Sequence, residues 1–254
     1  MLRPYFVRDH NRMVHHLIAK EPDYENAMAR AVGGAYAETG NQMRRVLESL
    51  GLRSTDYVID IGAGSGRLST ALKDVPNLRY LGTDVVPELL EFARKQCGRE
   101  DWTFKVVESI EIPEKGGVAD FVLFFSVFTH LKEKESFRYL QEAKRVLKKD
   151  GIIIVSYLDR KIPVHARVVG PGWFQLLARA AGRSTLNKLL SKEVLARWSK
   201  ELNLSIDHFE VPDNGQLLCA YRFAQAPSVQ SRLLGMSRQG STRGDNVRTS
   251  EARS

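Results

Sequence analysis

The feature that most constrains this chain is a glycine-rich turn that follows a short apolar run. The apolar run is Tyr57–Ile61, and three glycines follow it at alternating positions, Gly62, Gly64 and Gly66. Helical spacing of apolar residues begins directly afterwards, in residues 68–72. This order predicts a buried strand, a tight turn and the start of a helix. Such a turn lets a ligand approach the backbone where a Cβ would collide, and the helix start offers free N–H donors.

Two kinds of cofactor compete for a turn of this type. A dinucleotide fingerprint has its third glycine five residues after the first, and in this chain that position is Arg67. An acid, Asp60, stands near the end of the strand, and a carboxylate beside the turn repels a pyrophosphate but suits a cationic ligand. The segment resembles the S-adenosylmethionine loop of the class I methyltransferases, whose pattern is apolar-apolar-acid-apolar-Gly-x-Gly-x-Gly. The alternative is a turn with a structural role only.

Strands and helices alternate after the turn, which predicts right-handed crossovers and a doubly wound parallel sheet. Two later runs with a turn-rich link between them predict an antiparallel hairpin. The resemblance implies an α/β fold: a Rossmann-like, mostly parallel, seven-stranded sheet closed by a C-terminal antiparallel hairpin. The expected strands after the first are 79–84, 102–107, 119–126, 152–157, 203–210 and 216–223, with helices from Pro87 to near Gly98 and from Lys132 to Lys149.

The chain divides into three parts by composition. Residues 1–50 hold three helical patterns, expected near 1–20, 24–32 and 36–50, and are expected to form an N-terminal helical cap. Residues 51–223 are the methyltransferase-like domain, in which 159–190 form a basic insert expected to serve as a lid and to set acceptor specificity. Residues 224–254 are rich in Ser, Arg, Gly and Gln with few apolar anchors, which predicts a disordered basic tail.

The net charge of +8 is unevenly distributed. Residues 1–20, 159–200 and 225–254 carry +3, +7 and +3, so the remainder carries −5. Basic segments of this kind are either solvated faces or attract an anionic acceptor, a membrane surface or nucleic acid. The basic and amphipathic residues of the insert would suit a lipid-linked acceptor or peripheral contact with a membrane.

The bulk features favour a cytoplasmic protein without a metal. No apolar run approaches the roughly 20 residues that a bilayer span requires, and the first residues lack a signal-peptide core. Cys97 and Cys219 lie far apart, which is consistent with reduced thiols. The six histidines form no metal-binding motif, so no structural metal is expected.

The resemblance implies the roles of several residues at the strand ends. Asp84 ends the second strand, where a carboxylate accepts from both ribose hydroxyls of the cofactor; a helix-capping aspartate is the alternative. Glu108 and Ser109 end the third strand and would meet the adenine, although the family more often has Asp there. Asp60 would help to hold the methionine ammonium group. The cofactor-binding residues implied in this way are Asp60, Gly62, Gly64, Gly66, Asp84, Glu108, Ser109 and Ser126.

The run Ser126–Leu131 follows the fourth strand, at the carboxyl edge of the sheet where ligands bind. It lacks the Asn/Asp-Pro-Pro-aromatic motif of methyltransferases that act on DNA-base amines or glutamine amides, and it resembles the small-molecule members of the family. Transfer to a hydroxyl benefits from a general base, and His130 is the catalytic candidate. The alternative is a histidine that caps a helix or packs against the cofactor.

The sequence therefore predicts a methyltransferase that uses S-adenosylmethionine and acts on the oxygen or nitrogen of a small-molecule or lipid-linked acceptor. An anionic acceptor would suit the basic segments. Three alternatives remain open: a nicotinamide-binding reductase, a cofactor-binding module without catalysis, and an RNA or protein methyltransferase guided by the basic segments. No interleaving of aromatic and basic residues favours nucleic acid.

Overall fold

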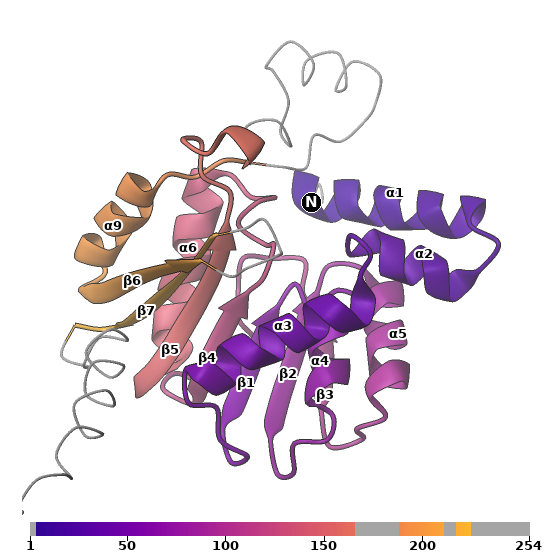
Figure 1. The fold of residues 1–254 in the computed structure, drawn as a ribbon, viewed down its shortest axis with the longest axis horizontal. Coiled ribbons are helices and arrows are strands. Elements are labelled where there is room, and N and C mark those ends of the chain that lie inside the picture. The colour runs from indigo at the N-terminus through magenta and orange to yellow at the C-terminus, as the bar shows by residue number, and fades with distance from the viewer. Residues whose placement is uncertain (1–3, 166–187, 211–216, 225–254) are drawn as a thin grey trace, which may run out of the picture.

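A seven-stranded sheet forms the centre of the molecule (Figure 1). The computed structural model describes residues 4–165, 188–210 and 217–224. Residues 166–187 of the expected insert 159–190, residues 211–216 between the two last strands and residues 225–254 of the expected tail 224–254 lie outside the described residues. The strands are β1 (Tyr57–Ile61), β2 (Arg79–Asp84), β3 (Thr103–Val106), β4 (Ala119–Phe124), β5 (Leu147–Tyr157), β6 (Leu204–Glu210) and β7 (Leu217–Phe223).

The order of the strands is β3-β2-β1-β4-β5-β7-β6. The first five strands pair in parallel, while β7 pairs antiparallel with both β5 and β6. The predicted doubly wound sheet with an antiparallel C-terminal pair is thus confirmed. After β3 the chain returns to the other side of β1 to form β4, so the strand order reverses between β1 and β4. Ligands of such sheets bind outside the carboxyl ends of the strands at this reversal.

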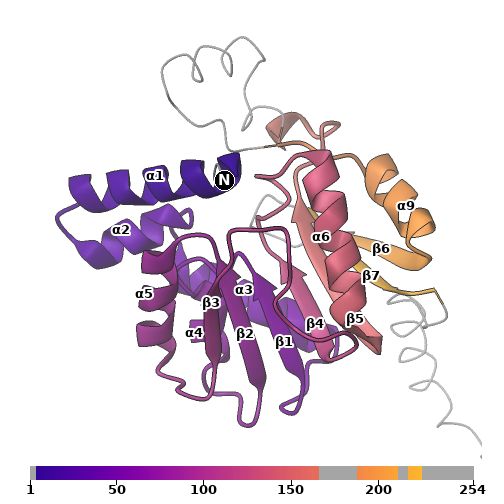
Figure 2. The ribbon, with the colours of Figure 1, turned by 180° about the vertical axis from the view of Figure 1, so that it is seen from behind.

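Helices cover both faces of the sheet because successive side chains of a buried strand point to opposite faces. In β1, Val58 packs with the helices of one face, and Ile59 and Ile61 pack with those of the other. Figures 1 and 2 show the two layers from opposite sides. One layer contains α3 (Tyr36–Ser49), α4 (Arg67–Leu72) and α5 (Pro87–Cys97), and the other contains α6 (Glu133–Val146) and α9 (Lys192–Glu201).

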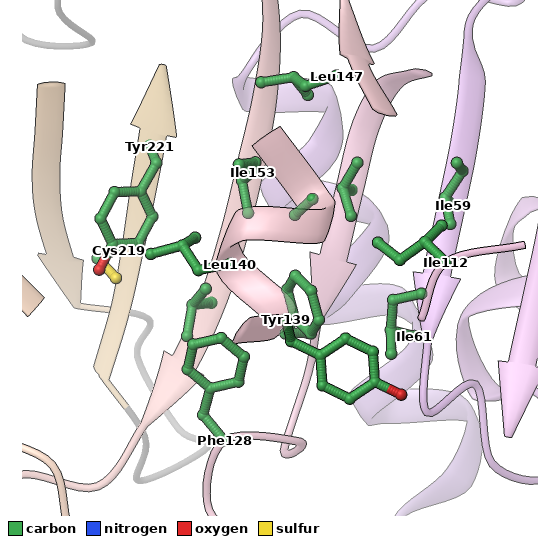
Figure 3. Close-up of a cluster of buried hydrophobic side chains, with 14 of the residues drawn as sticks. Ile59, Ile61, Ile112, Phe128, Tyr139, Leu140, Leu147, Ile153, Cys219 and Tyr221 are labelled. Carbon is green, nitrogen blue, oxygen red and sulfur yellow. The ribbon is translucent and has the colours of Figure 1, made fainter. Parts of the chain in front are cut away.

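The core on the α6 side is continuous from β1 to β7 (Figure 3). Leu140 of α6 packs there with Ile153 of β5 and Tyr221 of β7, and each of these side chains is fully buried. Burial of one large apolar side chain contributes about 1.5–3 kcal/mol. The antiparallel strands are therefore part of the same core as the parallel strands.

Two further helices, α1 (Tyr5–Lys20) and α2 (Tyr24–Ala31), lie together beyond the ends of the strands (Figures 1 and 2). The start of α1 is attached to α6, since the Tyr5 hydroxyl donates to Glu135 Oε2 (2.7 Å). Further along, Asn11 Nδ2 donates to the backbone oxygen of Val85, just after β2 (2.9 Å). Helix α1 therefore crosses the carboxyl edge of the sheet from the α6 side to the β2 side.

Several boundaries differ from the sequence-based expectation. The strands expected at 102–107 and 119–126 span Thr103–Val106 and Ala119–Phe124. The helix expected to reach Lys149 ends at Val146, and β5 begins at Leu147 instead of Ile152. Leu147 pairs with Ala119 at the start of β4, and the register then shifts before Phe121 pairs with Ile152. This irregularity accommodates residues 148–151, which lie between the two paired positions on β5. Helix α9 was not anticipated; the Ser191 hydroxyl caps it by accepting from the Val194 N–H (3.3 Å).

Among the described residues, the helices are too short or too polar to cross a lipid bilayer.

Candidate active site

A cavity of about 580 Å³ opens at the carboxyl edge of the sheet, where the strand order reverses. It combines residues that are distant in the sequence: the turn after β1, the end of β2, the segment after β4 and the face of α1 that covers them. Five residues predicted from the sequence line this one cavity, namely Gly62, Gly64, Asp84, Ser126 and His130.

The turn after β1 has the close approach that its glycines predict. Gly62 and Gly64 both have positive φ, +70° and +56°. A Cβ on Gly62 would lie 2.6 Å from Cγ2 of Val127, and a Cβ on Gly64 would lie 2.7 Å from Cγ1 of Val32. Side chains at either position would therefore be strained and would fill the wall of the cavity.

Asp84 is held toward the glycine turn. Its Oδ2 accepts from the Gly64 N–H (2.9 Å), and its Oδ1 accepts from the Val86 N–H (3.0 Å). Burial raises the pKa of the Asp84 carboxyl, and the Val86 bond, the nearby His10 charge and the Gly64 bond oppose that rise. The two alternatives for this aspartate, capping and ligand binding, are compatible because the same carboxylate braces the turn and lines the cavity.

Two of the predicted cofactor residues lie behind the cavity wall. Asp60 is 3% exposed and accepts from the Tyr80 hydroxyl (2.6 Å). Burial raises the pKa of Asp60 to about 7. Gly66 begins α4 with φ +88°, and a Cβ there would lie 2.6 Å from Cβ of Ala93 on α5. Gly66 therefore permits close packing of the two helices, and neither residue is among the described residues that line the cavity.

Glu108 and Ser109 line a neighbouring surface hollow, whereas Val107 lines the cavity itself. Tyr139 of α6 connects the two regions, because its ring lines the cavity and its hydroxyl donates to the Ser109 backbone oxygen (3.0 Å). The adenine-binding role of Glu108 and Ser109 remains a proposal.

The segment after β4 has a strained start. Ser126 has a φ of +62°, which is uncommon for a residue with a side chain. Its N–H donates to the Ser156 hydroxyl on β5 (2.6 Å). Backbone strain of this kind is frequent at functional sites. The turn directs Ser126, Thr129 and His130 into the wall of the cavity.

His10 of α1 is a cavity residue that the sequence did not reveal. Its ring lies against the ring of His130, with centroids 4.9 Å apart and planes at 72°. Its Nδ1 is 2.7 Å from the backbone oxygen of Phe6. The apolar spacing of residues 1–20 predicted an amphipathic helix, but no pattern in that spacing indicates that a polar residue faces a cavity.

The charges along the cavity separate into two kinds. Asp84 is the carboxylate among its described lining residues, and Arg30 and Arg67 are the guanidinium groups. Burial lowers the pKa of Arg67, and the charge of Asp60 opposes this. A negative group and a positive group on one small cavity fit a nucleoside with an amino-acid tail, since Asp84 suits sugar hydroxyls and Arg67 suits a carboxylate.

Among the described residues, no group of three His, Cys, Asp or Glu side chains is arranged to hold a metal ion.

Comparisons with known proteins point to one family. The model of the methyltransferase domain matches residues 59–155, which run from within β1 to within β5 and include the glycine turn. Norajmaline N-methyltransferase of Rauvolfia serpentina is 23% identical over 189 residues, which are 70% of this chain and 64% of that protein. The ubiquinone biosynthesis O-methyltransferase of Actinobacillus pleuropneumoniae is 26% identical over 152 residues, 58% of this chain and 64% of that protein.

The fold is likewise that of solved methyltransferases. The magnesium protoporphyrin IX methyltransferase of Synechocystis, solved with bound S-adenosylhomocysteine, superposes with a TM-score of 0.59 at 16% identity. The match covers 87% of this chain and 97% of that one. This chain spans just under two thirds of the length of the two curated relatives.

Proposed function

Residues 59–155 place this chain in the class I S-adenosylmethionine-dependent methyltransferase family, and from that premise we propose that it transfers a methyl group from S-adenosylmethionine to a small-molecule acceptor. The observation that carries the proposal is the position of Asp84. Its carboxylate is bonded to the N–H of Gly64 and lines the cavity at the point where the strand order reverses.

Different residues of the cavity would bind different parts of the cofactor. Asp84 would accept hydrogen bonds from the ribose hydroxyls, and the backbone at Gly62 and Gly64 would lie beside the amino-acid part. Arg67 would pair with the carboxylate of that part. S-adenosylmethionine, when bound, supplies a methyl group activated by a sulfonium. The protein's contribution is to align the acceptor with that methyl group and to exclude water.

The acceptor is proposed to be a small molecule, attacked through oxygen or nitrogen. Of the two relatives described above, one is named an N-methyltransferase and the other an O-methyltransferase. The cavity is enclosed by apolar residues of α1 and of the segments after β4 and β5, which suits a small or lipid-linked compound. A histidine of this region, with His130 as the residue predicted from the sequence, would serve as general base. We also propose that the protein is cytoplasmic.

Calorimetry with S-adenosylhomocysteine and with NAD, side by side, tests the cofactor. We expect saturable binding of S-adenosylhomocysteine and none of NAD, because the third glycine of a dinucleotide site is replaced by Arg67. If NAD binds and S-adenosylhomocysteine does not, the protein would instead be a nicotinamide-binding reductase.

Turnover separates the enzyme from a binding module. The protein would be incubated with methyl-labelled S-adenosylmethionine and a panel of phenols, amines and carboxylic acids, with ribosomal RNA and total protein as further arms. Label transfer to a small molecule is the expected result. Transfer to RNA or protein alone would contradict the proposed acceptor class.

A further inference from the structure

The part of the cavity next to α1 has several apolar side chains, and we take it as the acceptor end. Helix α1 contributes Phe6 and Met13, and the segments after β4 and β5 contribute Leu131 and Leu158. His10 lies on α1 between Phe6 and Met13 and lines the same cavity. Its ring contacts that of His130, which belongs to the segment after β4.

The hydrogen bond between His10 and the backbone of Phe6 determines which ring nitrogen of His10 carries a proton. Nδ1 is 2.7 Å from the backbone oxygen of Phe6. A carbonyl oxygen can only accept, so Nδ1 must carry the hydrogen. In the neutral imidazole, Nε2 is then the basic nitrogen. The helix thus holds His10 in the tautomer and the orientation of a base.

His165, which also lines the cavity, is held in the opposite tautomer. The Asp159 N–H donates to its Nδ1 (2.9 Å), so that nitrogen carries no proton. A neutral His165 therefore has its hydrogen on Nε2 and acts there as a donor. Of these two histidines, His10 has the tautomer that can take up a proton at Nε2.

We propose that His10 is the general base of this site and that the acceptor is an apolar phenol, an inference that rests on the proposed methyl transfer. The phenol O–H bond breaks and its proton passes to Nε2 of His10, while the oxygen forms the new bond to the methyl carbon. The bond from that carbon to the sulfonium sulfur breaks, and its electron pair stays on sulfur. The proton then leaves His10 for solvent.

The chemistry of the cavity selects a phenol from the possible acceptors. A phenol has a pKa of about 10 and imidazole one of about 6.5, so proton transfer between them is feasible, whereas water, at about 15.7, is a far weaker acid. A neutral amine attacks through its own lone pair and loses its proton only after methylation, so a base fixed beside the acceptor is of most use to a hydroxyl acceptor. His130 would then be a positioning residue that keeps the ring of His10 in place.

The test uses 4-nitrophenol, whose ionised form is yellow, added to the protein saturated with S-adenosylhomocysteine. We expect the bound compound to show a larger ionised fraction than the free compound at the same pH, because its proton is shared with His10. His10→Asn should abolish that excess. Asn can still donate to the Phe6 oxygen but has no basic nitrogen, so the affinity for S-adenosylhomocysteine should stay within threefold.

His16→Asn is the matched control, because His16 is exposed on the same helix; it should behave as wild type. His10→Gln is the second variant if Asn disturbs α1, and it should also lose the excess. The proposal is overturned if 4-nitrophenol does not bind or if His10→Asn retains the ionised excess. If His130→Asn removes the excess that His10→Asn retains, the base is His130 and not His10. A wild-type protein that fails to bind S-adenosylhomocysteine would instead refute the proposed function, and this inference with it.

Discussion

Asp84 connects the architecture of the turn with ligand binding. Removal of its carboxylate would take away two charge-assisted hydrogen bonds to the ribose, each of about 1.5–3 kcal/mol. Asp84→Ala should therefore weaken the binding of S-adenosylhomocysteine about 10²–10⁴-fold in calorimetry. Asp84→Asn keeps an oxygen for the Gly64 N–H and should bind with intermediate affinity. Asp74→Ala, at an exposed acid paired with Arg44, is the control and should bind as wild type.

Asp60 makes stability depend on pH. Its pKa in the folded protein is about 7, above the ordinary value of 3.8. The folded state therefore holds this proton more tightly, and the contribution of Asp60 to the free energy of unfolding is lost as the pH rises from about 4 through 7. Asp60→Asn, which can still accept from the Tyr80 hydroxyl, should gain in melting temperature relative to wild type across that range.

The control for Asp60 is Asp74→Asn. The pKa of Asp74 is lowered by its bond to Arg44, so its small contribution is present at neutral pH and lost in acid. The difference in melting temperature between Asp74→Asn and wild type should thus stay nearly constant above about pH 5 and change only in more acidic solution. A constant difference for Asp60→Asn from pH 4 to 7 would contradict a raised pKa.

The sequence predicted residues such as Gly62 and Asp84 at the cavity because both stand at strand ends in a recognisable pattern. His10 could not be found this way. Its place depends on how α1 crosses the sheet, and this is fixed by contacts such as that from Asn11 to Val85, which no local pattern reports. Asp60 was predicted to bind the cofactor but is buried behind the cavity wall, where it accepts from Tyr80 of the next strand, and the sequence pattern did not reveal this partner.

At the level of elements, the glycine turn and the segment after α2 fit closely together. Gly64→Ala would place a Cβ about as close as 2.7 Å to Val32 and would force a positive φ on alanine, which costs about 1–2 kcal/mol by itself. We expect a clear loss of stability in urea unfolding. In the double variant with Val32→Ala, the part of the stability loss that is due to the collision should be restored.

The double-mutant cycle decides between the two causes. If the collision matters, the two substitutions together should cost less than the sum of the single changes, with Val32→Ala alone as the matched reference. Strict additivity would mean that the positive φ accounts for the whole effect and that Val32 moves aside.

Regular elements with strong periodicity were predicted well, while the junctions were not. The strand Tyr57–Ile61 and the helix from Pro87 agree with the sequence-based expectation. The start of β5 was missed because Leu147 is an apolar residue that suits either a helix end or a strand start. Helix α9 was missed although Ser191 is a good N-cap and Leu195 and Trp198 have helical spacing.

For the whole molecule, cofactor binding should appear as stability. A ligand at one hundred times its dissociation constant adds about 2.7 kcal/mol to the free energy of unfolding. In a protein of this size that corresponds to a rise of about 5–10 °C in melting temperature. S-adenosylhomocysteine should produce this shift in differential scanning fluorimetry, NAD should not, and Asp84→Ala should abolish it at the same ligand concentration.

The overall fold was the most predictable level, because alternating strands and helices leave few topologies once right-handed crossovers are required. The pairing of β7 with both β5 and β6 agrees with the predicted hairpin and adds the strand order within it. Acceptor specificity is the least predictable property, since the cavity is assembled from segments that are distant in the sequence.

The position of β7 also has a consequence for synthesis on the ribosome. This strand follows β6 in the chain but lies between β5 and β6 in the sheet. A nascent chain that has emerged only as far as β6 leaves the backbone of β5 with an open edge, to which a stray strand can pair. The sheet can be completed only after Phe223 has left the exit tunnel. We therefore expect the domain to close in one late step, after β6 has been synthesised.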